Sequence, residues 1–328
     1  MKLVRAFGGR QNIGLVVLIG LVLLVGTPIA HAQFAPDTDF TVERFRLSSD
    51  RNGIFSVESA EVLPDLSLDV GLWIGYADAP LNLHQSVNGA DRERIASLVS
   101  RRLTGSLVGA FSVLDRLQVG VELPFILNQD QDVVGIAGPP DSIKSGGVGD
   151  LRLLPKVQIL NHTDHFLDVA LGLGLVLPTA TSDDYFGDER LLFQPELLLS
   201  GPITDQLRFG FNIGYRNRKE QEIADLVVGD EVYGGLGAAY RFTDVVELAA
   251  TFNAATSTDD FLGTFNRNYA EAAGGLTLYF HDFVVFAAGG VGTGEGFGTP
   301  DWRALGGVRF GLKIDDAEET PALVADEG

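Results

Sequence analysis

From Leu66 onward, the sequence is organised by apolar residues at every second position. In the first such segment, these positions are Leu66, Leu68, Val70, Leu72, Ile74 and Tyr76. Polar or small residues such as Ser67, Asp69 and Gly71 fill the alternate positions. Because successive side chains of a strand point to opposite faces, this pattern predicts a strand with one oily face and one polar or small face.

The same alternation recurs along the chain and predicts twelve strands. Their expected ranges are 65–77, 101–113, 116–127, 147–160, 165–178, 191–200, 206–218, 230–242, 244–256, 268–280, 283–293 and 301–313. Most are about 10 to 14 residues long, which is the length that a tilted strand needs to cross a bilayer. We therefore predict an all-β fold, a transmembrane antiparallel up-and-down β-barrel of about 12 strands.

The connections between the predicted strands alternate in length. Short links follow the even-numbered strands, for example at residues 114–115 and 281–282, whereas long polar links follow most odd-numbered strands, for example at 78–100 and 128–146. Outer-membrane barrels have short periplasmic turns and longer extracellular loops. This regular alternation therefore favours a barrel over a soluble sandwich and predicts both termini in the periplasm.

The N-terminus predicts export. Lys2, Arg5 and Arg10 precede an apolar run at residues 13–25, and Ala30-His31-Ala32 matches a cleavage pattern. The run is too short for a membrane anchor, so we predict a secretory signal peptide. The chain is then divided into a signal peptide (1–32), a periplasmic leader or plug segment (33–64), the transmembrane barrel (65–313) and an acidic disordered tail (314–328).

Composition narrows the partners. The net charge is −20, and the chain has no Cys. Nucleic-acid binding needs clustered Lys and Arg, so this acidic chain is not expected to bind it. The expected setting is the outer membrane of a Gram-negative bacterium, with lipid, lipopolysaccharide, the barrel-assembly machinery and small solutes as partners.

If the oily face meets lipid, the opposite face lines the barrel interior and carries charges of both signs. The candidate lumen-lining residues are Asp69, Glu122, Asp150, Arg152, Lys156, Asp168, Glu196, Arg208, Arg216, Glu231, Arg241, Glu247, Glu271, Arg303 and Arg309. They form either an ion-pair network that plugs the lumen or the wall of a narrow aqueous pore. Inward glycines leave space for solute or ease strand packing; Gly120, Gly210, Gly235 and Gly237 are examples. The leader folds into the lumen, caps its periplasmic mouth, or is a flexible lead-in.

Candidate catalytic chemistry is sparse. His162 and His165 form an HxxH motif in a predicted turn. We interpret this segment as a solvated turn rather than a metal site. A loop with acidic residues near Asp184 reads as a solvated loop in preference to a cation site. No His falls within a predicted strand interior, where a barrel hydrolase would need one. We expect no enzyme activity, cofactor or metal.

Several segments resemble known families. Residues 41–46, 50–58 and 296–303 resemble a group of OmpA-family outer-membrane proteins, and residues 146–156 and 177–179 also resemble transporter-like barrels of the MetA pathway of phenol degradation. The resemblance implies an integral outer-membrane protein. Members of the OmpA-like group carry a C-terminal domain that binds peptidoglycan, whereas this sequence ends soon after the last strand, so wall anchoring is not expected.

Two functional classes follow. The first is a porin-like or transporter-like barrel that passes small polar solutes or feeds apolar compounds through its wall, with the lumen charges setting selectivity. The second is a closed structural barrel that supports the envelope or displays surface loops.

Overall fold

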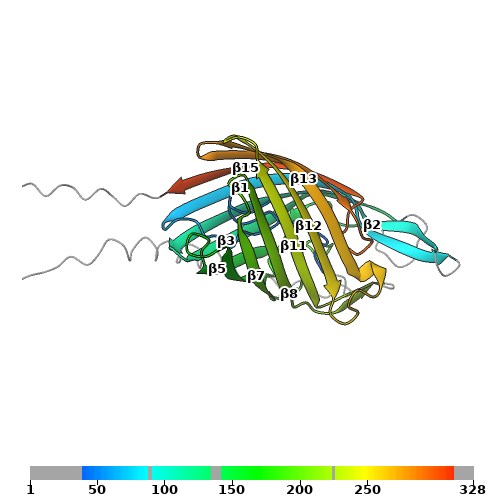
Figure 1. The fold of residues 1–328 in the computed structure, drawn as a ribbon. Helices are drawn as coiled ribbons and strands as arrows, with labels where there is room; N and C mark the ends of the chain where they lie inside the picture. Colours follow the sequence, from blue (N-terminus) through cyan, green and yellow to red (C-terminus); the bar gives the residue numbers. More distant parts are fainter. Residues whose placement is uncertain (1–38, 88–90, 134–141, 224–225, 314–328) are drawn as a thin grey trace, which may run out of the picture. The chain divides into compact units, whose positions relative to one another are not determined.

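The computed structural model describes residues 39–87, 91–133, 142–223 and 226–313. The predicted signal peptide and acidic tail lie outside these residues. Twelve long strands run through the described part of the chain (Figure 1): β1 (Ser67–Val87), β2 (Asp91–Leu114), β3 (Leu117–Asp132), β5 (Leu151–Leu160), β6 (Asp168–Leu177), β7 (Leu192–Pro202), β8 (Leu207–Arg216), β11 (Glu231–Arg241), β12 (Val246–Ser257), β13 (Asn268–Phe280), β14 (Phe283–Gly292) and β15 (Trp302–Lys313).

These strands form one closed antiparallel barrel. Each pairs with its neighbour in the sequence of long strands, and β1 pairs with both β2 and β15, which closes the ring. The remaining elements are short. They are β4 (Gly147–Val148), which pairs with β3, the paired strands β9 (Gln221–Ile223) and β10 (Leu226–Val228), and the 3-10 helix η1 (Phe265–Arg267). No described helix is both long and apolar enough to cross a membrane. The predicted twelve-strand barrel is confirmed.

The alternation of residues determines which face of each strand points outward. In β1, Leu72 and Ile74 are 45% and 47% exposed, whereas Asp69 and Trp73 on the other face are 0% and 1% exposed. Large apolar side chains on other strands are exposed in the same way, including Leu171, Leu236, Phe252 and Phe310. The barrel therefore has an apolar outer surface, and the polar faces of its strands point inward.

The first hairpin is much longer than the sequence pattern predicts. Residues 78–100 were expected to form a loop, but β1 and β2 stay paired beyond Asp78, with register shifts near Leu81 and Leu83. Figure 1 shows this hairpin projecting past the other strands. Leu81, Leu83 and Leu98 are buried in an apolar cluster, and this packing stabilises the extension.

The predicted strand 147–160 is interrupted. Gly149 and Asp150 separate β4 from β5. The Asp150 carboxylate accepts hydrogen bonds from the backbone N–H groups of Thr179, Ala180 and Asp188, at 2.9, 2.9 and 2.6 Å. Asp150 thus holds the loop that follows β6 against the barrel. Because its carboxylate binds this loop, Asp150 lies outside the strand ladder.

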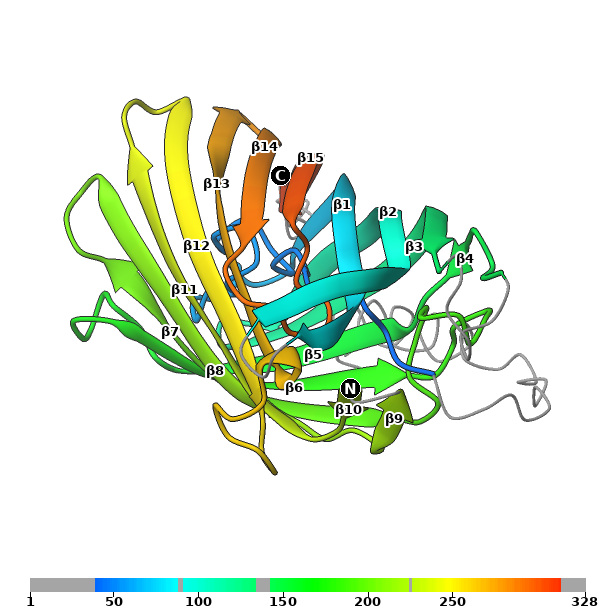
Figure 2. The same ribbon diagram turned by 90° about the vertical axis from the view of Figure 1, so that its right-hand side faces the viewer.

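The two ends of the barrel differ. We call the end with the short connections, such as His281–Asp282, the turn end, and the opposite end the loop end. Residues 39–64, which precede β1, lie within the ring of strands and are called the lumen segment. Figure 2 shows this segment, in blue, inside the barrel. Its side chains contact inward residues of strands all around the wall, as described next.

Candidate functional site

The lumen segment begins at the loop end with an apolar contact. The ring of Phe40 meets the rings of Tyr185 and Phe297 edge-on, with centroids 5.6 and 5.4 Å apart. Phe40 and Val42 are fully buried in the cluster that also holds the long first hairpin. Burial of these side chains supplies a hydrophobic attachment for the start of the segment.

Farther along, the segment packs on small residues of the wall. A Cβ added at Gly237 would lie 3.2 Å from Ile54, and one at Gly120 would lie 2.7 Å from the Cβ of Ser49. Phe45 packs edge-on against Trp73, with ring centroids 5.1 Å apart. The inward glycines therefore make room for the lumen segment, which takes much of the space that the sequence offered to solute.

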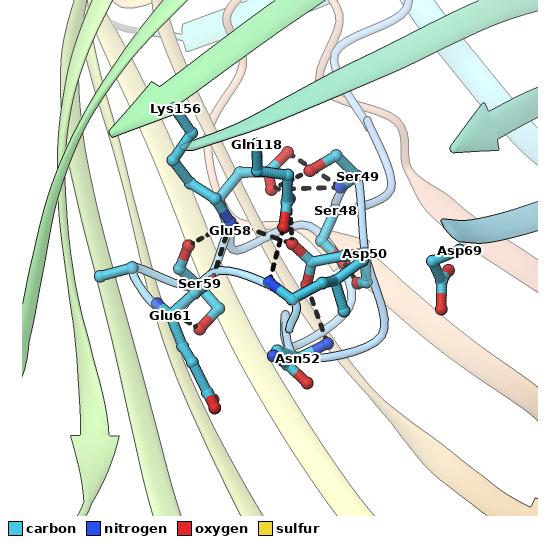
Figure 3. Close-up of polar contacts among 12 residues, drawn as sticks. Ser48, Ser49, Asp50, Asn52, Glu58, Ser59, Glu61, Asp69, Gln118 and Lys156 are labelled. Atoms are coloured by element: carbon cyan, nitrogen blue, oxygen red, sulfur yellow. Dashed lines mark hydrogen bonds and ion pairs between the residues drawn. The ribbon is translucent and has the colours of Figure 1, made fainter. Parts of the chain in front are cut away.

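A buried lysine anchors the middle of the segment. Lys156 on β5 is 0% exposed, and its Nζ donates to Asp50 Oδ2 at 2.9 Å and to the carbonyl oxygens of Ser59 and Glu61 at 2.9 and 3.0 Å. Gln118 on β3 also donates to Asp50 Oδ2, at 2.6 Å. Figure 3 shows both wall side chains pointing toward Asp50. The lumen segment is thus tied to two strands through one carboxylate.

A second cluster of charges lies nearer the loop end. Glu231 on β11 accepts hydrogen bonds from Arg44 of the lumen segment, at 2.7 Å to each carboxylate oxygen, and from Arg216 on β8. Arg218 lies 3.7 Å from the same carboxylate and 2.8 Å from Asp188. One buried carboxylate therefore balances several guanidinium groups from the segment and the wall.

The structure places the fifteen candidate lumen residues as follows. Thirteen are buried: Asp69, Glu122, Asp150, Arg152, Lys156, Asp168, Glu196, Arg216, Glu231, Glu247, Glu271, Arg303 and Arg309. Arg208 is partly buried and pairs with Glu247 at 2.8 Å. Arg241 lies at the turn end, with its side chain 43% exposed and 3.5 Å from Glu247.

Most of these residues pair with an opposite charge. Arg152 lies 2.7 Å from Glu196, Arg303 lies 2.9 Å from Glu271, and Arg309 lies 3.1 Å from Asp69. The sequence left open an ion-pair network or the wall of an aqueous pore. In the described part of the chain, ion pairs occupy much of the barrel interior. The sequence could not supply the partners that come from the lumen segment, namely Glu43, Arg44, Asp50, Arg51 and Glu58.

Cavities remain beside the lumen segment. The central cavity, of about 80 Å³, is lined by Arg44, Arg46, Arg152, Gln194, Arg216 and Tyr233 among others. A smaller cavity of about 30 Å³ adjoins Arg46 and Glu122. The turn-end vestibule, of about 460 Å³, is lined by residues that include Arg51, Glu61, His162, Asp168, Arg208 and Arg241. The space is therefore wide at the turn end and narrow at the centre.

The groups considered for metal binding have protein partners. His162 Nδ1 lies 2.8 Å from Asp168 Oδ2, which places this histidine at the rim of the vestibule. In the acidic loop, Asp188 pairs with Arg218, and Asp184 accepts from Ser182 and Lys144. Within the ranges that the structure describes, no group of three or more His, Cys, Asp or Glu residues could hold a metal ion.

Asp39, at the start of the lumen segment, predicts a pH effect at the loop end. Burial, together with the carboxylates of Asp183, Glu189 and Asp184, raises the pKa of Asp39 from 3.8 to about 7. The folded state therefore favours the protonated acid, and the stability that this proton contributes is lost as the pH rises from about 4 through 7. We expect protease cleavage near residue 39 to be faster at pH 8 than at pH 5, and Asp39→Asn to flatten this difference. An unchanged pH slope in the variant would assign the effect to other groups.

The sequence matches a known protein family. Residues 83–308, more than half of the chain, match the family described as "Putative MetA-pathway of phenol degradation". The chain belongs to that family. The resemblance to MetA-pathway barrels is thus confirmed, whereas that to the OmpA family is not supported. No curated protein matches the chain.

Three solved structures resemble the chain, and the first of them shares its fold. An outer-membrane channel from Pseudomonas putida F1 is 14% identical, with a TM-score of 0.59 over 77% of this chain and 98% of that one. The toluene transporter TodX of Pseudomonas putida is 11% identical over 84% and 98% of the two chains, with a TM-score of 0.42. The toluene transporter TbuX of Ralstonia pickettii is 12% identical over 77% and 90%, with a TM-score of 0.38.

The likeness to the first of these structures supports the predicted barrel fold. This fold agrees with the predicted porin-like or transporter-like barrel and does not favour the closed structural alternative.

Proposed function

We propose that this protein is a narrow outer-membrane channel for small solutes, with the lumen segment acting as its plug. The observation that carries the proposal is the placement of residues 39–64 inside a closed barrel, tied to the wall through Asp50 and Glu231. The remaining central cavity, of about 80 Å³, has room for about five waters. A solute larger than this passes only if the lumen segment shifts.

The charged contacts suit a plug that moves as a unit. Polar and ionic contacts to a segment of the same chain can be exchanged for water, whereas the wall keeps its own hydrogen-bonded ladders when the segment leaves. We place the turn end, with its wide vestibule, in the periplasm and the long loops outside the cell, as the alternation of connection lengths indicates. We propose transport rather than catalysis as the role of the interior charges.

Planar-bilayer conductance tests this function. Protein purified from outer membranes and shown to be folded by heat-modifiable gel mobility is expected to give small discrete steps. A variant that lacks residues 39–62 but keeps the strands is expected to give much larger steps, because the lumen is then empty. Folded protein of both kinds that stays silent would overturn the channel proposal.

We further propose small phenolic or related aromatic compounds as the physiological solutes. The support is the family description, together with a vestibule of about 460 Å³ that is large enough for a single aromatic ring. Uptake of radiolabelled phenol at limiting concentration, in Gram-negative cells that lack general porins, is expected to be faster when the protein is present. Equal uptake with and without the protein, alongside measurable conductance, would assign a different solute.

A further inference from the structure

The central cavity contains one arginine without an ion-pair partner. Arg46 of the lumen segment borders both the central cavity and the smaller cavity next to it. In the described part of the chain, no carboxylate forms an ion pair with its guanidinium, and its one hydrogen bond is a long one, from Nη1 to Gln194 Oε1 at 3.4 Å. A partly buried cation without an ion-pair partner is costly, so the site favours an added negative charge.

The neighbouring charges are already engaged with one another. Glu196 accepts from Arg152 Nη2 at 2.7 Å, and Glu58 accepts from the backbone N–H of Ser49 at 3.0 Å. The central cavity is lined by four arginines, Arg44, Arg46, Arg152 and Arg216, and by two glutamates, Glu58 and Glu196. In the described part of the chain, Arg46 is the one of these four arginines that forms no ion pair.

Further hydrogen-bond donors of the cavity lining lack acceptors. The Nε2 of Gln194 and the Nε atoms of Arg152 and Arg216 are buried without a hydrogen-bond partner. Gln194, Arg152 and Arg216 are 1%, 8% and 8% exposed, and all of them line the central cavity together with Arg46. Buried donors are normally satisfied, so the lining of this cavity is rich in donors and short of acceptors.

Glu122 is the carboxylate that competes for Arg46. It lines the smaller cavity that Arg46 borders, and it accepts a hydrogen bond from Ser106 Oγ at 3.2 Å. It forms no ion pair with any residue that the structure describes. Glu122 lines the smaller cavity and not the central one, whereas Arg46 borders both.

We propose that the central cavity is a binding site for a small monovalent anion, of the size of a halide or formate, held by Arg46. A volume of about 80 Å³ accepts such an ion with a few waters and excludes an aromatic acid. Gln194, Arg152 and Arg216 supply additional N–H donors. The site goes beyond the proposed channel function, because it predicts binding whether or not solute passes.

Bromide identifies the site directly by anomalous scattering. Crystals of the protein purified from outer membranes and soaked in sodium bromide are expected to show an anomalous peak within hydrogen-bond distance of the Arg46 guanidinium. Arg46→Gln is expected to lose this peak, and Glu122→Gln is expected to keep it. Peaks at surface sites alone, a peak that survives Arg46→Gln, or a peak that appears only in Glu122→Gln would each overturn the proposal.

Ion selectivity gives a second readout. Under a potassium chloride gradient, the reversal potential of the wild-type channel is expected to report a preference for chloride, and Arg46→Gln is expected to reduce the chloride-to-potassium permeability ratio several-fold. The matched control is Arg101→Gln, because Arg101 is exposed and pairs with Asp130 at 3.2 Å. If the protein gives no conductance but its crystals bind bromide, the channel proposal is wrong and the anion site is supported. If the protein conducts, binds no bromide and has the same selectivity in Arg46→Gln, the anion-site proposal is wrong and the channel proposal is supported.

Discussion

Lys156→Met is expected to release the lumen segment while the barrel stays folded. Lys156 is fully buried, and its ammonium group holds Asp50 and two backbone carbonyls of the segment. Removing one partner of a buried ion pair costs about 3–5 kcal/mol, because the other charge is left uncompensated. That cost falls on the docking of the segment, since the ladders of β5 with β3 and β6 do not use the lysine side chain.

Trp73 offers a direct measurement of this release. The chain has two tryptophans, and Trp73 packs against Phe45 of the lumen segment. In a Trp302→Phe background, we expect Lys156→Met to shift the emission of Trp73 to longer wavelength and to raise protease cleavage within residues 39–64. The conductance steps are expected to grow in parallel.

The matched control for this prediction is Lys219→Met. Lys219 lies 2.7 Å from Glu189 in an exposed ion pair, with side-chain exposures of 41% and 33%, and such pairs contribute about 1 kcal/mol or less. If Lys156→Met matches this control in emission, cleavage and conductance, the buried pair does not hold the plug. If Lys156→Met fails to assemble, the double variant with Asp50→Asn removes both charges and is expected to restore a folded barrel with a loosened segment.

Glu231→Gln is expected to destabilise the whole barrel more than Lys156→Met does. The Glu231 carboxylate is 3% exposed and balances Arg44 of the lumen segment together with Arg216 and Arg218 of the wall. Without its charge, several buried guanidinium groups repel one another, at a cost of at least about 3–5 kcal/mol. Heat-modifiable gel mobility is expected to report a fall in the unfolding temperature on the order of 10 °C.

Asp130→Asn is the matched control for Glu231→Gln. Asp130 pairs with Arg101 at 3.2 Å, and the two side chains are 44% and 62% exposed, so the loss of this charge is expected to have little effect on unfolding. Equal unfolding temperatures for the two variants would show that the Glu231 cluster is not a main contributor to stability.

The alternation along each strand was sufficient to predict the barrel. The row that includes Leu72 and Ile74 faces outward, and the row that includes Asp69 and Trp73 faces inward, because side-chain direction along a strand is a local property with a period of two. The same locality explains why the extension of β1 and β2 was missed. Residues 78–100 carry an irregular pattern, with register shifts, and their pairing is stabilised by packing with Phe40 and Phe297, which are distant in the sequence.

By itself, the sequence determined the strand number, the oily outer face, the charged inner face and the family resemblance to the MetA-pathway barrels. Only the tertiary structure decided what fills the interior. Arg44 and Glu231 are 187 residues apart, and Asp50 and Lys156 are 106 residues apart, so no local pattern could pair them. The inward glycines illustrate the same limit, since a small residue in a strand signals space, and only the folded chain shows that the lumen segment occupies it.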